Sequence, residues 1–227
     1  MTTARAIAEL LALLAPPACV ACRAPLGEAD RLLCPACVRA LPWLRGVRCP
    51  GCGLPRHRRS GCPAAGAAFA TAWSPLAYEG AARDLVQALK FRGALPVAEL
   101  MAAQMAAGLP AGMRGVDAVV PVPAHRGRRR RRGFDPAGAL AAALAPRLEL
   151  PLEPCLRRGG GRRQVGAARA ERRDPSRLAV TTTRAPPKRV LLVDDVHTTG
   201  ATLDACARAL TNGGARWVVA ASYARTL

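Results

Sequence analysis

Aromatic residues are scarce in this chain of 227 residues, at 4% of the composition. Proteins that bind single strands through OB folds or RNA-recognition motifs stack successive bases on aromatic side chains, so the composition argues against both classes. The chain also lacks an uncharged apolar run of about 18 residues, the length that a membrane-spanning helix needs, and we expect no membrane span. A Walker A loop is excluded as well, because no Gly-x-x-x-x-Gly-Lys-Ser/Thr motif occurs.

Positive charge is what the chain has in excess. Its 34 lysines and arginines against 15 acidic residues give a formal net charge of +19, and its 51% of hydrophobic residues is typical of a folded protein rather than a disordered basic tail. Such a charge indicates an anionic partner: nucleic acid, a nucleotide or a phosphorylated small molecule. Arg126–Arg132 holds six arginines, and Cys155–Arg177 holds eight arginines and two acids. Three consecutive glycines lie in the second stretch, which we interpret as a mobile loop.

The first residues superficially resemble a secretory or lipoprotein leader, because the apolar stretch Ala6–Ala15 precedes Cys19. Glu9 lies in the middle of that stretch, however, and the leucines at positions 10, 11, 13 and 14 have helical spacing. We therefore expect an amphipathic first helix rather than a cleaved leader. Together with the metal-binding pattern of the cysteines described next, this indicates a cytoplasmic protein.

Six of the nine cysteines form Cys-x-x-Cys pairs near the start of the chain. Cys19 and Cys22 are followed by Cys34 and Cys37, which is the spacing of a four-cysteine zinc ribbon. Each two-residue spacer lets both thiolates turn toward one ion, and the segment between the pairs can form the hairpin that brings them together. A redox dithiol is the alternative, but such motifs occur singly beside a βαβ unit. We predict a structural zinc site.

Cys49 and Cys52 begin a second unit, to which Cys62 adds a third thiolate. The partner expected from a further Cys-x-x-Cys spacing is missing, because position 65 is alanine. His57 could supply the fourth ligand; a solvent-exposed loop histidine is the alternative. A closed shell of four thiolates leaves no position for a substrate, so we assign the zinc to the folding of a head that is too small to bury its own core.

From Phe69 onward, short β-branched runs alternate with segments rich in alanine and leucine. The expected strands are 118–122, 190–194 and 216–222, and the expected helices are 81–92, 137–145 and 201–212. Strand, helix and strand in this order predict an α/β fold with right-handed crossovers and a parallel sheet. Because Ala64–Ala68 is a join of small residues, we divide the chain into a cysteine-rich zinc-ribbon head, residues 1–68, and an α/β body, residues 69–227.

The most informative stretch begins with the apolar strand Val190–Val193. Asp194 and Asp195 follow at its carboxyl end, where ligands of open α/β sheets bind. The next residues, Thr198-Thr199-Gly200-Ala201-Thr202, offer backbone N–H groups, hydroxyls and the positive end of a helix, which together suit a phosphate monoester. Carboxylates would repel that phosphate, so the vicinal hydroxyls of a ribose are their natural partners.

This stretch resembles the signature of type I phosphoribosyltransferases, whose ligand is 5-phosphoribosyl-1-pyrophosphate (PRPP). The resemblance implies that Asp194 and Asp195 hold the ribose hydroxyls, and that Thr198, Thr199, Gly200, Ala201 and Thr202 hold the 5′-phosphate. It further implies that pyrophosphate is displaced from C1 of ribose, with Mg²⁺ bridging the hydroxyls and the pyrophosphate. Purine-salvage enzymes have an aspartate base at the position of Thr198, and the adjacent His197 is a candidate substitute.

Several segments together are similar to the ComF/GntX family, the competence protein F-like phosphoribosyltransferases with a double zinc ribbon. They are the head, Val119-Val120-Pro121-Val122-Pro123 with its arginine run, the Gln164-Val165-Gly166 loop, the PRPP loop, Tyr78-Glu79-Gly80 and Leu85–Gly93. The chain departs from the family pattern at Ala65, at Asp135-Pro136, where Asn-Gln is usual, and at His197, which replaces an apolar residue.

The resemblance implies a phosphoribosyltransferase that binds PRPP and Mg²⁺ and is linked to DNA uptake. The candidates for neutralising the pyrophosphate and excluding water are Arg126, Arg128, Gln164, Arg169 and Arg172. Two alternatives stay open. One is a competence factor that binds single-stranded DNA through this fold without turnover, working with other DNA-uptake proteins; the other is a regulator that senses PRPP.

Overall fold

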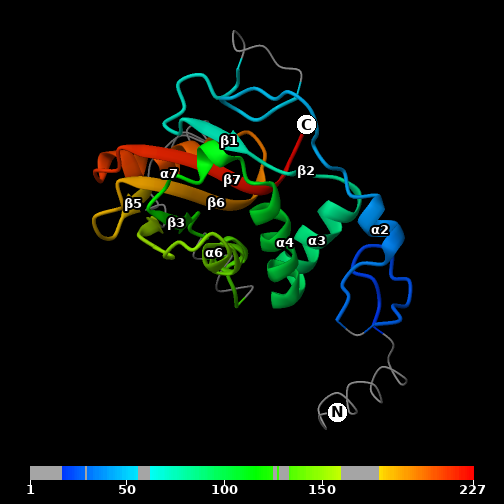
Figure 1. The fold of residues 1–227 in the computed structure, drawn as a ribbon. Helices are drawn as coiled ribbons and strands as arrows, with labels where there is room; N and C mark the ends of the chain where they lie inside the picture. The colour runs from blue at the N-terminus through cyan, green and yellow to red at the C-terminus, as the bar shows by residue number, and fades with distance from the viewer. Residues whose placement is uncertain (1–16, 29, 56–61, 125–126, 128–132, 160–178) are drawn as a thin grey trace, which may run out of the picture.

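The computed structural model describes residues 17–28, 30–55, 62–124, 127, 133–159 and 179–227. Their central element is a parallel sheet with the strand order β1-β7-β6-β3 (Figure 1). Its strands are β1 (Thr71–Trp73), β3 (Ala118–Pro121), β6 (Arg189–His197) and β7 (Trp217–Arg225), and β2 (Leu76–Ala77) also pairs with β7 in parallel. The α/β fold with a parallel sheet that the sequence predicts is confirmed.

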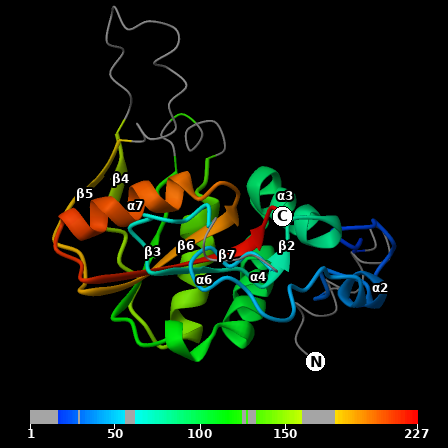
Figure 2. The ribbon, with the colours of Figure 1, turned by 90° about the horizontal axis from the view of Figure 1, so that it is seen from above.

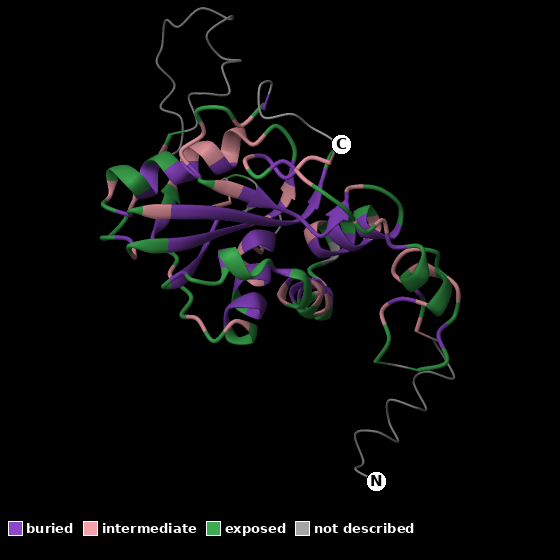
Figure 3. Ribbon diagram, turned by 45° about the horizontal axis from the view of Figure 1, so that its top comes forward, coloured by how far each residue is buried: buried purple, intermediate pink, exposed green. Residues whose placement is uncertain are grey.

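Helices cover both faces of this sheet. They are α3 (Gly80–Arg92), α4 (Leu95–Gly108), α6 (Pro136–Arg147) and α7 (Ala201–Asn212), with the short 3-10 helix η2 (Ala111–Met113) after α4. Successive side chains of a strand point to opposite faces. Leu191 and Val193 of β6 therefore pack in one cluster with residues of α3, α4 and α6, whereas Leu192 packs in a second cluster with α7. The strands run buried through the middle of the molecule (Figure 3).

The bounds of several elements differ from those expected. Helix α7 begins and ends where predicted, but β6 and β7 extend to His197 and Arg225 because their ladder continues that far. Helix α4 is absent from the sequence-based expectations, because its apolar residues surround the helix and give no clear period. Among the helices described, none is long and apolar enough to cross a bilayer.

The segment that starts at Cys155 begins as part of the core, so its interpretation as a loop is wrong for the described residues. Strand β4 (Leu156–Arg158) pairs antiparallel with β5 (Val180–Thr182) beside the main sheet (Figure 2). Cys155 and Leu156 are buried in the same cluster as Cys206 of α7. The arginines dominate the composition here, yet a strand places alternate residues on opposite faces, so Arg157 is exposed while Leu156 is buried.

The head packs directly against the body. Cys19 and Leu33 are buried in the same cluster as residues of α4, and the short helix α2 (Pro35–Arg39) follows Cys34. In the second unit, a Cβ atom at Gly53, whose φ is +72°, would lie 2.6 Å from the carbonyl oxygen of Ala72. Such a close approach of two backbones requires glycine.

The join between head and body is held by hydrogen bonds to α7. The N–H of Ala68 donates to Oδ1 of Asp204 at 2.8 Å, and Arg208 donates to the carbonyl oxygen of Gly66 at 2.8 Å. The division at residues 68 and 69 stays a prediction.

Candidate functional site

A pocket of about 290 Å³ lies at the carboxyl ends of β3 and β6. The register pairs Pro121 of β3 with Val193 of β6, so the residues that follow these positions reach the same edge of the sheet. The pocket is lined by Tyr78, Lys90, Val122, Pro123, Ala124, Phe134, Asp135, Pro136, Ala137, Arg158, Asp194, Asp195, Val196, Thr198 and Thr202. Four of the predicted ligand-binding residues, two aspartates and two threonines, are thus brought together.

The two aspartates have different surroundings. Burial and the adjacent charge of Asp195 raise the pKa of Asp194 to about 8, so this carboxyl group is mostly protonated at neutral pH. The N–H of Asp195 donates to Oδ1 of Asp194 at 2.8 Å and opposes that shift. Asp195 is buried and forms an ion pair with Lys90, whose Nζ lies 2.7 Å from its Oδ1.

Two basic side chains reach the pocket from elements that are remote in sequence. Lys90 lies in the last turns of α3, and Arg158 ends β4. Sequence patterns single out neither, because Lys90 belongs to an ordinary helical segment and Arg158 is one of many arginines. One signal is available for Lys90: the only other lysine of the chain is Lys188.

The residues predicted to bind phosphate form the turn into α7. Gly200 precedes the helix with φ +85°, and a Cβ atom at this position would lie 2.9 Å from Nε2 of His197. Thr198 and Thr199 are exposed beside it. Because the first N–H groups of a helix have no partner within the helix, this turn presents backbone donors and hydroxyls next to the carboxylates.

His197 does not take the role of a base in the pocket. Its side chain is 2% exposed, lies beneath Gly200, and is absent from the pocket lining. Arg225 donates through Nη1 to its Nδ1 at 2.5 Å, and the ring of Phe69 meets the imidazole edge to face. Burial and the charge of Arg225 lower the pKa of His197 to about 4, so the imidazole is neutral and supports the turn from below.

The candidates for neutralising pyrophosphate cannot be placed. Arg126, Arg128, Gln164, Arg169 and Arg172 all lie outside the described residues, and so does His57, the candidate fourth ligand of the second metal site.

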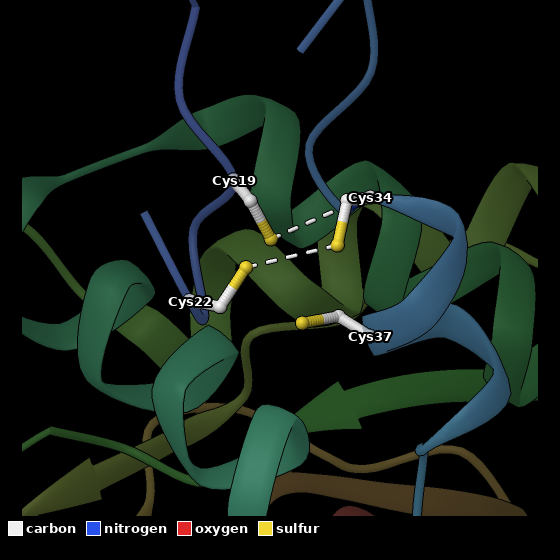
Figure 4. A group of neighbouring side chains, drawn as sticks. All are labelled: Cys19, Cys22, Cys34 and Cys37. Atoms are coloured by element: carbon white, nitrogen blue, oxygen red, sulfur yellow. Dashed lines mark hydrogen bonds between the residues drawn. The ribbon is translucent and has the colours of Figure 1, made fainter. Parts of the chain in front are cut away.

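The first cysteine cluster has the geometry of a closed metal site. The sulfur atoms of Cys19, Cys22, Cys34 and Cys37 lie within 4.8 Å of one another and point to a common centre (Figure 4). Burial alone would raise the pKa of Cys19, but backbone N–H groups, including those of Cys22 and Cys34, lower it to about 6. Four converging sulfurs, one of them held readily as a thiolate, fit tetrahedral zinc.

The second cluster brings together three thiols. Cys49, Cys52 and Cys62 also have sulfur atoms within 4.8 Å of one another. Arg225 lies close enough for their negative charges to raise its pKa, against the larger lowering by burial, and its buried Nε has no hydrogen-bond partner among the described groups. These three sulfurs can supply three of the four ligands of a zinc ion, and the guanidinium would offset part of the charge of the thiolates.

Comparisons with known proteins agree with this geometry. Residues 10–66, which include all seven of these cysteines, match the model of the double zinc ribbon domain. The competence protein F of Haemophilus influenzae is 36% identical to this chain over 104 residues, which are 43% of the chain and 45% of that protein. The match thus spans less than half the length of this curated relative. Structural zinc in the head is supported by both the domain and the sulfur clusters.

Replacing a ligand of the first cluster should release its metal. In Cys34→Ser we expect the zinc content of the purified chain, measured by atomic emission, to fall by about one ion per chain, because a closed ribbon site needs all four thiolates. The control is Cys155→Ala, which removes a buried cysteine outside both clusters. Equal zinc in Cys34→Ser and the unmodified chain would rule out this site.

Glycine at position 200 should be required by the turn. Gly200→Ala is expected to lower the free energy of unfolding by about 1–3 kcal/mol, because alanine is strained at positive φ and its Cβ would collide with His197. Urea denaturation measures the loss. Gly112→Ala is the control, since a Cβ there meets nothing within 4 Å; equal stability of the two variants would contradict the described turn.

Proposed function

We propose that this chain, whose double zinc ribbon and likeness to competence protein F support its assignment to a ComF-like family, binds PRPP with Mg²⁺ and acts as a phosphoribosyltransferase in a competence-related role. One observation carries the proposal. Asp194 and Asp195 line the same small pocket as Thr198 and Thr202. Paired carboxylates beside a phosphate-type turn suit a ligand that carries both a diol and a phosphate.

The ligand is oriented by these two groups of residues. Ribose hydroxyls donate to Asp194 and Asp195, while the 5′-phosphate accepts from the N–H groups and hydroxyls of the turn before α7. A sugar held at both ends presents C1 in a defined direction. The pocket volume of about 290 Å³ is close to the lower end for small-molecule sites, about 300 Å³.

Catalysis in this arrangement rests on charge. Bound Mg²⁺ supplies positive charge to the pyrophosphate leaving group. The carboxylates of Asp194 and Asp195 favour the positive charge that develops on the ribose ring as the bond at C1 breaks. Lys90 and Arg158, which line the pocket, add positive charge on the chain's side. The roles of Arg126, Arg128, Gln164, Arg169 and Arg172 in holding pyrophosphate stay predictions.

Single-stranded DNA is a second candidate ligand. The net charge of +19 and the two arginine-rich stretches favour a polyanion larger than PRPP, and the name of the H. influenzae relative refers to competence. Neither DNA binding nor PRPP sensing needs turnover. A regulator that senses PRPP would use the same pocket. We also propose that the chain acts in the cytoplasm, together with DNA-uptake proteins. Thiols stay reduced in the cytoplasm, so they remain able to bind zinc.

PRPP should bind more tightly as the pH rises from 6 to 8. The ribose hydroxyls donate to an ionised Asp194, whose pKa is about 8 in the free chain. Binding below that pH therefore releases a proton, and the affinity for PRPP rises by at most about tenfold per pH unit. Calorimetry in buffers of different ionisation enthalpy measures the number of protons released on binding. Asp194→Asn should abolish this release, whereas Asp117→Asn, at the opposite end of the sheet, should not.

The same pKa shift makes a second, ligand-free measurement possible. Because the folded chain holds the Asp194 proton more tightly than the unfolded chain does, stability should fall as the pH rises from 3.8 to about 8. Asp194→Asn should remove this part of the pH dependence in urea titrations.

Absence of any calorimetric heat from PRPP with Mg²⁺ would overturn the ligand assignment itself.

Salt titration separates DNA binding from the pocket. If single-stranded DNA binds through the two arginine-rich stretches, its affinity should fall with salt, with a log–log slope of about 0.7 per phosphate neutralised. Fluorescence anisotropy should show that slope unchanged in Asp194→Ala plus Asp195→Ala, which loses PRPP. Loss of DNA binding in this double variant would show instead that both ligands need the pocket.

A further inference from the structure

The ion pair between Lys90 and Asp195 lies inside the pocket rather than on the surface. The side chains are 22% and 11% exposed, and Nζ and Oδ1 are 2.7 Å apart. The other charged groups that line the pocket are Asp135, Asp194 and Arg158. The attraction within a shielded pair of this kind is screened by water and salt less than the attraction within an exposed pair.

We propose that Lys90 is a ligand-binding residue that serves as the counter-ion of Asp195 in the ligand-free state and moves to the pyrophosphate group when PRPP binds. This inference rests on the proposed function, because it assumes that PRPP is the ligand.

The exchange follows from charge balance. Adjacent carboxylates in a half-buried pocket need positive charge nearby, since an unpaired buried charge is costly, and Lys90 supplies it to Asp195. When ribose hydroxyls donate to Asp195, they compete with the ammonium group for the oxygens of this carboxylate. The incoming pyrophosphate brings negative charge to the same pocket, and the flexible four-carbon stem of lysine lets the ammonium group follow it while the helix stays in place.

Anchoring of α3 does not depend on this ion pair. The helix is fixed to the core by Ala82, Leu85, Val86 and Leu89, all of them fully buried. Lys90 is the next residue, but its side chain leaves the core and reaches the pocket. Removing its charge should therefore change ligand binding while the fold is kept.

Two ligands distinguish this role from a structural one. Ribose 5-phosphate carries the diol and the 5′-phosphate but no pyrophosphate, whereas PRPP with Mg²⁺ carries all three. For Lys90→Met in the full chain, we expect calorimetry to show PRPP binding weakened by about tenfold or more, and ribose 5-phosphate binding not weakened, because its hydroxyls no longer displace an ammonium group from Asp195. Lys90→Arg, which keeps the charge, should recover most of the PRPP affinity.

The chain offers a matched control for net charge. Lys188 is the only other lysine, and its Nζ donates to the carbonyl oxygen of Gly214 at 3.2 Å, away from the pocket. Lys188→Met should leave both affinities unchanged, which would show that the effect of Lys90→Met is local.

Other outcomes would overturn the inference. Lys90→Met could weaken the binding of both ligands equally, or affect binding no more than Lys188→Met does. In either case the charge of Lys90 would serve only the structure or the net charge of the chain. That result would leave the proposed function intact, because the unmodified chain would still bind PRPP. If the unmodified chain bound neither ligand, the proposed function would fail first.

Discussion

The site depends on the central place of β6 in the sheet. This strand pairs with β3 on one side and with β7 on the other, and its residues Val190–Val193 are fully buried. A strand that is paired along both edges and covered on both faces can bring side chains to a ligand only where it ends. Asp194 and Asp195 must therefore emerge at the carboxyl edge, and the turn before α7 must begin beside them. The pocket, its ion pair and the turn all follow from this ladder.

Charge is distributed unevenly between the surface and the pocket. The chain carries a net charge of +19, yet the pocket is lined by the neighbouring carboxyl groups of Asp194 and Asp195. Burial and the charge of Asp195 raise the pKa of Asp194, and Lys90 neutralises Asp195. Without a ligand, the group formed by Asp194, Asp195 and Lys90 thereby has little net charge. A ligand with a diol and phosphates is matched to such a site, because it can donate to the carboxylates while its anionic groups face the basic side chains.

The head and the phosphate turn are linked through the end of the sheet. Arg225 ends β7, and the negative charge of the second cysteine cluster raises its pKa against the larger lowering by burial. Its guanidinium donates to His197, whose ring lies next to Gly200. On the other side, Asp204 in the first turn of α7 accepts from Ala68 in the join. The cysteine-rich head and the join after it thus contact the start of α7, which lies beside the pocket.

Spacing and periodicity were sufficient to predict the two cysteine clusters, the parallel sheet and helix α7, because the spacing of metal ligands, the order of strands and helices and the apolar period can all be read along the sequence. The Asp194–Thr202 stretch was recognisable for the same reason. The role of His197 was not, since only the fold shows that Arg225 and Gly200 enclose its ring. Nor could Lys90 be assigned to the site, because the distance from its Nζ to Asp195 is set by how α3 packs on the sheet. Local chemistry was determined by the sequence alone, whereas the meeting of charges from separate elements was decided by tertiary packing.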